Sequence, residues 1–302
     1  MNKVIRVISH PGLALKKICK KFLLLLPDEP YLRVRYRQEM GKRLNLTDPQ
    51  TFSERIQWLK LYDRQPEYTM MVDKYAVKDY VARILGEEFI IPTLVVWDNV
   101  EDIEWDKLPD QFVLKCTHDS GGQVICRDKS SLDKEEAVRI LRWGMKQNYY
   151  RKTREWPYKN VPRRIIAEKY IKPAPGTDDL ADYKFFCFNG EPRYCQVISG
   201  RGKKMCIDFF DMEWRHQPFH EPKNYPFADI EPARPMHFDR MQDAARQLTK
   251  GRAFCRIDFY EVGDKVYFGE ITFYPTSGMG GFDPEEWDYS FGKWITLPNR
   301  KR

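Results

Sequence analysis

Four residues near the C-terminal end of the chain, Arg256, Asp258, Glu270 and Thr272, have the side chains of a magnesium site. They form two pairs, each two residues apart in a run that alternates as a β-strand does, so the members of a pair share one face. A Gly-Asp pair between the two runs supplies a hairpin turn. Strand pairing would gather a guanidinium, two carboxylates and a hydroxyl on one patch. Mg²⁺ prefers oxygen ligands and usually keeps substrate phosphates in its shell, so the patch indicates nucleotide chemistry.

The same patch also has a purely structural interpretation, which is an antiparallel hairpin with a salt-bridged outer face. R-x-D and E-x-T are common strand patterns, so this spacing leaves both interpretations open. Other segments of the chain favour the nucleotide.

A candidate phosphate site surrounds Lys115, at the end of an apolar strand predicted for residues 112–117. A Ser-Gly-Gly loop follows at 120–122, and glycines let backbone N–H groups approach an anion closely. A lysine beside such a loop suits a phosphate, although a plain hairpin with a surface lysine has the same sequence. His118 in this loop could serve as a base or as a hydrogen-bonding partner of the loop or of a phosphate.

A candidate adenine site follows the strand predicted for residues 164–171. Glu168 and Tyr170 lie near its end. A connector with exposed backbone groups and a nearby acid can contact an adenine edge and ribose hydroxyls, but this signal is weak by itself.

Helices and strands alternate irregularly along the chain. Residues 1–70 are predicted to be helical, with a capping box at 51–54, and a second amphipathic helix covers 73–85. Further strands are expected at 89–97, 123–126, 183–188 and 193–199, and further helices at 133–150 and 238–248. Residues 216–236 hold five prolines and are predicted to form a long surface excursion.

The composition excludes several classes of protein. The 302 residues carry a net charge of +7, which suits a nucleotide, a polyanionic sugar or an anionic lipid. No RNA-binding module or DNA-binding helix pattern is present, so no nucleic-acid partner is expected. The seven cysteines form no CxxC pair, which favours reduced thiols in a cytoplasmic protein.

The N-terminal arm could contact a membrane without crossing it. No apolar run approaches the ~20 residues of a membrane span. Residues 3–26 form a basic amphipathic segment that could lie on the inner face of a membrane, or could dock on its own domain.

The order of these segments resembles the ATP-grasp superfamily, and more closely its teichuronopeptide-biosynthesis (TupA-like) family, over roughly residues 45–295. The segments that carry the resemblance are 52–60 (FSERIQWLK), 72–75 (VDKY), 114–122 (LKCTHDSGG), 154–158 (REWPY), 166–170 (IAEKY), 182–190 (DYKFFCFNG) and 268–275 (FGEITFYP).

The resemblance implies an α+β chain with the ATP-grasp fold, in which two antiparallel-sheet subdomains enclose the nucleotide. Residues 1–70 would be an N-terminal helical extension in place of the usual βαβ substrate domain. Residues 71–302 would form the ATP-grasp domain, with a lid subdomain at about 112–170 and a metal-binding core at about 171–302.

The resemblance also implies a role for each candidate residue. ATP phosphates would be bound by Lys74 and Lys115 and covered by the loop of Ser120, Gly121 and Gly122. Glu168 and the backbone of Tyr170 would meet adenine. The γ-phosphate and an acyl-phosphate intermediate would face Lys184 and Arg256. Mg²⁺ would be held by Asp258 and Glu270, and by Thr272, which stands where many superfamily members have asparagine.

The implied reaction is ATP-dependent ligation of a carboxylate and an amine through an acyl-phosphate. The expected partners are a carboxylate-bearing sugar or glycan of a bacterial surface polysaccharide, or its precursor, and an amine donor. Two alternatives stay open. One is a glycosyltransferase, whose metal-binding acids could only be the close pair Asp178-Asp179. The other is a non-catalytic, membrane-associated scaffold.

Overall fold

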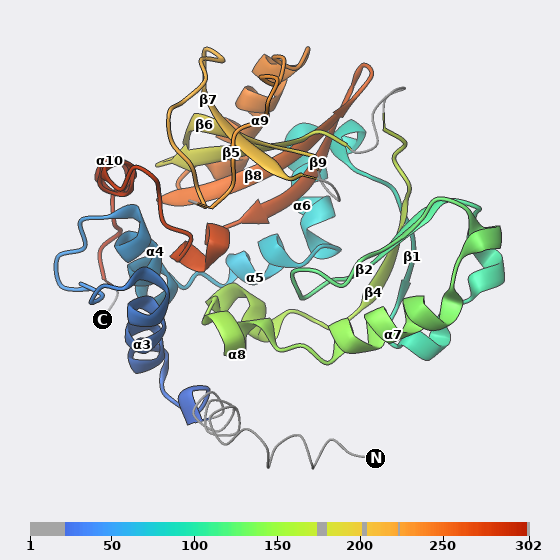
Figure 1. Ribbon diagram of the computed structural model, residues 1–302. Helices are drawn as coiled ribbons and strands as arrows, with labels where there is room; N and C mark the ends of the chain where they lie inside the picture. Colours follow the sequence, from blue (N-terminus) through green and yellow to red (C-terminus); the bar gives the residue numbers. More distant parts are fainter. Residues whose placement is uncertain (1–21, 174–179, 201–203, 223, 301–302) are drawn as a thin grey trace.

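The computed structural model describes residues 22–173, 180–200, 204–222 and 224–300 of the chain. It consists of two antiparallel sheets with helices packed around them (Figure 1). The prediction of an α+β chain with two antiparallel-sheet subdomains is therefore confirmed.

The smaller sheet has four strands in the order β1-β4-β2-β3: β1 (Thr93–Trp97), β4 (Ile165–Lys169), β2 (Phe112–Cys116) and β3 (Val124–Cys126). In β2 the apolar side chains of Phe112 and Leu114 are buried, whereas Lys115 is partly exposed on the other face. The buried face packs on helix α7 (Lys134–Met145), whose Leu141 joins the same hydrophobic cluster. The alternation of the strand therefore sends Lys115 away from this core.

The larger sheet has five strands in the order β7-β6-β5-β8-β9: β7 (Cys206–Asp211), β6 (Glu191–Ser199), β5 (Asp182–Phe188), β8 (Phe254–Val262) and β9 (Lys265–Thr272). Every residue of the central strand β5 is buried, because both faces are covered. Phe185 packs on Phe238 of helix α9 (Phe238–Thr249), while Phe186 packs on Phe291 of helix α10 (Glu286–Trp294).

The N-terminal helices share the core of the larger sheet. They are α3 (Asp28–Met40), α4 (Phe52–Tyr62), α5 (Glu67–Val72) and α6 (Ala76–Leu85). The predicted capping box starts α4, since Thr51 Oγ1 accepts from Glu54 N at 3.1 Å and Glu54 Oε2 accepts from Thr51 N at 3.2 Å. Phe52 then packs against Phe188, Phe254 and Phe291. The domain boundaries given above stay predictions.

Three details differ from the sequence prediction. The helix expected over 133–150 is interrupted, because Asn148 accepts from Arg151 N at 2.8 Å and caps a separate helix α8 (Tyr149–Thr153). The strand expected over 89–97 starts only at Thr93, after Pro92. Strand β7 was not predicted at all.

Short 3₁₀ helices complete the fold. They are η1 (Glu87–Phe89), η2 (Val100–Asp102), η3 (Trp105–Lys107), η4 (Lys129–Ser131), η5 (Trp156–Asn160) and η6 (Pro275–Gly278). Within the part of the chain that the structure describes, no helix has both the length and the apolar character needed to cross a membrane.

Candidate active site

A row of polar side chains crosses four neighbouring strands of the larger sheet. The register pairs Glu270 of β9 with Asp258 of β8, Asp258 with Lys184 of β5, and Lys184 with Gln196 of β6. Residues that pair in register have their side chains on the same face of a sheet, so strand pairing alone assembles this row.

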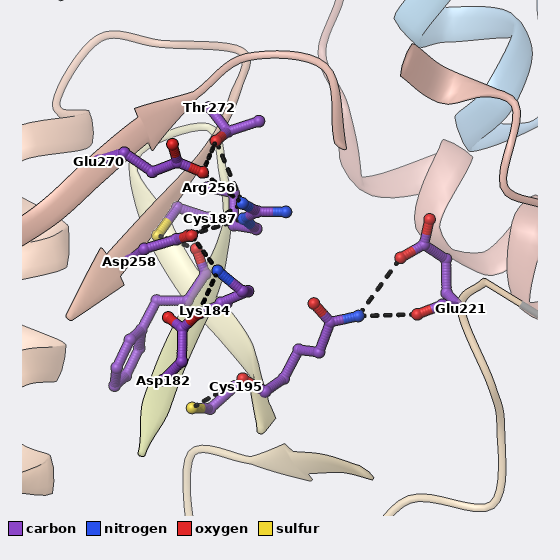
Figure 2. Close-up of polar contacts among 11 residues, drawn as sticks. Asp182, Lys184, Cys187, Cys195, Glu221, Arg256, Asp258, Glu270 and Thr272 are labelled. Carbon is purple, nitrogen blue, oxygen red and sulfur yellow. Dashed lines mark hydrogen bonds and ion pairs between the residues drawn. The ribbon is translucent and has the colours of Figure 1, made fainter. Parts of the chain in front are cut away.

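Arg256 contacts the other three residues of the predicted magnesium patch, Asp258, Glu270 and Thr272 (Figure 2). Its Nε donates to Asp258 Oδ1 at 2.7 Å and its Nη2 donates to Asp258 Oδ2 at 2.8 Å. The same Nη2 lies 3.0 Å from Glu270 Oε1 and 3.2 Å from Thr272 Oγ1. The structure thus places all four residues in contact, and it also shows the salt bridges of the structural interpretation.

Lys184 continues the network toward the start of β5. Its Nζ donates to Asp258 Oδ2 and lies 2.8 Å from Asp182 Oδ2. Asp258 is 1 % exposed, whereas the side chain of Glu270 is 44 % exposed. Partial burial would raise the pKa of Glu270, but Arg256 and Lys184 outweigh it and hold this pKa well below its usual range. Glu270 is therefore the ionised carboxylate that an incoming cation can reach.

A pocket lies between the two sheets and adjoins this network. It is lined by Ile91, Val113, Lys115, Gln123, Ile125, Arg127, Lys169, Tyr170, Ile171, Pro173, Leu180, Asp182 and Tyr260. Six of these residues lie on strands, namely on β2, β3 and β4 of the smaller sheet and on β5 and β8 of the larger one, and the others lie on segments that flank these strands or β1. Asp182 belongs both to the pocket wall and, through Lys184, to the polar row.

Two lysines hold Glu168 beside this pocket. Lys115 Nζ lies 2.7 Å from Glu168 Oε2, and Lys78 Nζ lies 2.6 Å from Glu168 Oε1. Burial would raise the pKa of Glu168, but the two ammonium groups lower it below its ordinary value. An ionised acid between two cations therefore lies beside the pocket, and Tyr170, whose backbone is predicted to contact adenine, lines its wall.

Lys74 contacts the loop predicted to cover the phosphates. Its Nζ donates to the carbonyl oxygen of Asp119, and its backbone N–H donates to Thr117 O at 3.2 Å. Ser120 is exposed, and Gly121 and Gly122 have φ values of 110° and 63°, which a residue with a Cβ rarely adopts. The loop conformation therefore requires these glycines.

His118 lies at the start of this loop, next to Asp119. It is buried, and neither ring nitrogen has a hydrogen-bond partner among the described residues. Burial lowers the pKa of His118 to about 4, so the ring is neutral at physiological pH.

The sequence of residues 54–296 matches the family model described as TupA-like ATPgrasp. The chain belongs to this TupA-like ATP-grasp family. The family predicted from the segment order is thereby confirmed. No match was found among curated proteins.

Similar solved structures include two D-alanine–D-alanine ligases. The enzyme from Bacillus anthracis complexed with ATP is 18 % identical with a TM-score of 0.41, and the match covers 75 % of this chain but only 65 % of that one. The enzyme from Helicobacter pylori is 14 % identical with a TM-score of 0.42, covering 82 % and 69 %. An ATP-grasp RimK domain protein from Sphaerobacter thermophilus is 13 % identical with a TM-score of 0.40, covering 78 % and 70 %.

Sequence reasoning missed four residues around the ATP-grasp site. Lys78 could have been found, because it follows Lys74 by four residues on a predicted helix and so shares its face. Asp182 directly precedes the strand predicted over 183–188 and lies two residues before Lys184. Gln196 and Glu221 carried no local signal, since only the pairing of β6 and the path of the chain after β7 bring them to the site.

Proposed function

We propose that this ATP-grasp protein is a ligase that uses ATP to join a carboxylate to an amine through an acyl-phosphate. The observation that carries the proposal is the continuity between the pocket and the polar row. Asp182 lines the pocket that holds Lys115 and Tyr170, and it pairs with Lys184, which in turn contacts Asp258. A nucleotide in the pocket would therefore direct its phosphates along a line of charged groups toward Arg256.

The polar row and the neighbouring Thr272 have oxygen ligands that suit Mg²⁺. The described residues contain no group of three or more His, Cys, Asp or Glu that could hold a metal ion. Asp258 and Glu270, with the hydroxyl of Thr272, would supply the protein's oxygen ligands, and ATP phosphates would complete the shell. When bound, the ion would neutralise charge on the phosphates that it touches.

The protein's own residues would position the reacting groups and balance their charge. Lys74 and Lys115, joined by Lys78, would bind phosphate oxygens. Lys115 and Lys78 would do so at the expense of their contacts with Glu168. Arg256 presents a planar guanidinium that suits bidentate contact with a phosphoryl or acyl-phosphate group. Catalysis would then rest on orientation and electrostatic stabilisation, without a side-chain nucleophile.

The acceptor that we propose is a carboxylate on a bacterial surface polysaccharide or its precursor, such as a uronic acid. Four cationic residues of the segment 151–164 support this choice because they are exposed: Arg151, Lys152, Lys159 and Arg163. Arg154 is not available, since it is buried and donates to the carbonyl oxygens of Leu24 and Leu26. The competing glycosyltransferase reading depends on Asp178-Asp179, which lie outside the described residues.

Mg-ATP should raise the melting temperature of the protein by mass action, and Lys115→Ala should weaken this effect. Loss of one charged phosphate contact is expected to reduce ATP affinity at least about tenfold. Thermal denaturation with increasing Mg-ATP measures the shift, and Lys107→Ala is a matched control because its side chain is 73 % exposed and pairs only with Glu104 among the described residues. Stabilisation by UDP-glucose but not by ATP would contradict the ligase and favour a glycosyltransferase.

We also propose that residues 3–26 attach the cytoplasmic protein weakly to the inner face of the membrane. Only residues 22–26 of this segment lie within the described ranges, and there Phe22 and Leu25 are 66 % and 68 % exposed. Four lysines precede them: Lys16, Lys17, Lys20 and Lys21.

The full chain should co-sediment with anionic vesicles at low salt and dissociate at high salt, because salt screens the attraction of lysines to lipid headgroups. Replacing the four lysines by alanine should abolish the sedimentation, whereas neutral vesicles serve as the control. A protein that stays in the supernatant with anionic vesicles at low salt would rule out the attachment.

A further inference from the structure

Glu221 adds a third carboxylate near Arg256, besides Asp258 and Glu270, and it lies outside the predicted site. It lies on the chain between β7 and α9, and its carboxylate is on the side toward which the Arg256 guanidinium points (Figure 2). Glu221 Oε1 accepts from Thr276 Oγ1 at 2.6 Å. Gln196 Nε2, at the end of the polar row, donates to the Glu221 carbonyl oxygen at 2.7 Å and lies 3.5 Å from Oε2.

This carboxylate lacks a cationic partner although it is buried. Glu221 is 2 % exposed, and no Lys, Arg or His of the described ranges forms an ion pair with it. Burial raises its pKa to about 6, and the hydroxyl of Thr276 and the charge of Arg256 only partly oppose this effect. A buried acid without a cation is costly, so its presence requires a reason.

The backbone of residues 276–280, which packs against Glu221, has an unusual conformation. Thr276 and Ser277 have φ values of 47° and 57°, and non-glycine residues in this region are typical of functional sites. A Cβ at Gly280 would lie 2.6 Å from Glu221 Oε1 and 2.5 Å from Thr276 Oγ1. Only glycine therefore fits against the Glu221–Thr276 pair, and Thr276 itself is exposed.

We propose that Glu221 binds the ammonium group of the amine donor and, with Gln196 and Thr276, orients it toward the carbonyl group held by Arg256. One ammonium proton passes to the Glu221 carboxylate, and the freed amine then forms the C–N bond as phosphate leaves the acyl-phosphate. This inference rests on the ligase function proposed above. A carboxylate suits a cation and repels the acceptor carboxylate and the ATP phosphates, so it separates the two substrates of the reaction. Thr276 Oγ1 already donates to Glu221 Oε1, whereas Oε2 has only the 3.5 Å contact with Gln196 Nε2.

The test is a thermal-shift series on the full chain with Mg²⁺ and a non-hydrolysable ATP analogue. The probes are a panel of L-amino acids and ethanolamine, each compared with its N-acetyl derivative, which has no ammonium group. At least one ammonium-bearing probe should raise the melting temperature of the wild type, and its N-acetyl form should not. Glu221→Gln should need at least a tenfold higher concentration of that probe for the same rise. The matched control is Glu231→Gln, which makes the same change at an exposed position of the same segment.

The Mg-ATP shift separates failure of this inference from failure of the ligase proposal. If the ATP analogue does not stabilise the wild type, the ligase itself is refuted. If the analogue stabilises both proteins but no ammonium probe acts on the wild type, or a probe acts equally on Glu221→Gln, the amine site is refuted.

The melting temperature of the ligand-free protein tests whether the Glu221 carboxylate has only a structural role. Glu221→Gln should melt at or above the wild-type temperature, because glutamine keeps an oxygen for Thr276 and removes an unpaired buried charge. Thr276→Val should melt lower, because it leaves the carboxylate without its hydroxyl donor. A fall in Glu221→Gln as large as that in Thr276→Val would identify Glu221 as a structural anchor and overturn the proposal.

Discussion

Replacing Glu270 by glutamine should reduce ATP turnover at least about a hundredfold with little change in melting temperature. Removing a group that balances charge in a phosphoryl-transfer site typically costs 10²–10³ in rate. The stability effect should be small because the Glu270 side chain is 44 % exposed and makes only one of the ion pairs of Arg256. ADP release from Mg-ATP with pools of uronic acids and amino acids measures the rate.

Asp258→Asn should lose turnover to the same extent but also lose stability. Asp258 is 1 % exposed and contacts both Arg256 and Lys184, so its removal leaves buried cations with fewer partners, at a cost of roughly 3–5 kcal/mol. Asp264→Asn, in the exposed turn of the same hairpin, is the control for both variants. Full turnover in either Glu270→Gln or Asp258→Asn would leave the patch as a structural salt-bridge cluster.

Phe291→Ala should be the most destabilising single change among the aromatic residues that join α10 to the sheet. Its ring is fully buried and contacts Phe52 of α4, Phe186 and Phe188 of β5, and Tyr194 of β6. Truncating such a ring leaves a cavity and typically costs about 3–5 kcal/mol, which corresponds to a fall of roughly 5–10 °C in melting temperature.

The control for this change is Tyr289→Ala, which removes an aromatic ring from the same helix at a position that is 45 % exposed. Thermal denaturation followed by circular dichroism compares the two variants. Equal melting temperatures would show that α4 and α10 do not share a core with the larger sheet.

The hairpin of β8 and β9 illustrates what sequence patterns can predict. Arg256, Asp258, Glu270 and Thr272 could be placed together because strand side chains alternate with a period of two and a Gly-Asp turn fixes the pairing. The structure adds that Arg256 contacts both carboxylates at once. That geometry depends on rotamers and burial, which no spacing rule determines.

Contacts between distant segments explain what the sequence could not predict. Strand β7 has the sequence CIDFFD, in which apolar and polar residues do not alternate, and all of its residues but the last are buried, so periodicity does not distinguish it. Glu221 and Gln196 meet across 25 residues of chain, and the register of β6 with β5 sets their position. The roles of the predicted ATP and magnesium ligands stay predictions until the variants above are measured.

The place of Glu221 on a connecting segment has a consequence for how such a ligase can diversify. Lys115, Lys184 and the residues proposed to hold Mg²⁺ lie on paired strands, where any shift of register would displace several side chains together. The proposed amine site instead belongs to a tether between β7 and α9, which can change in length or composition without disturbing that pairing. Exchanging this connecting segment between family members would then change the preferred amine donor without changing the residues proposed for phosphoryl transfer.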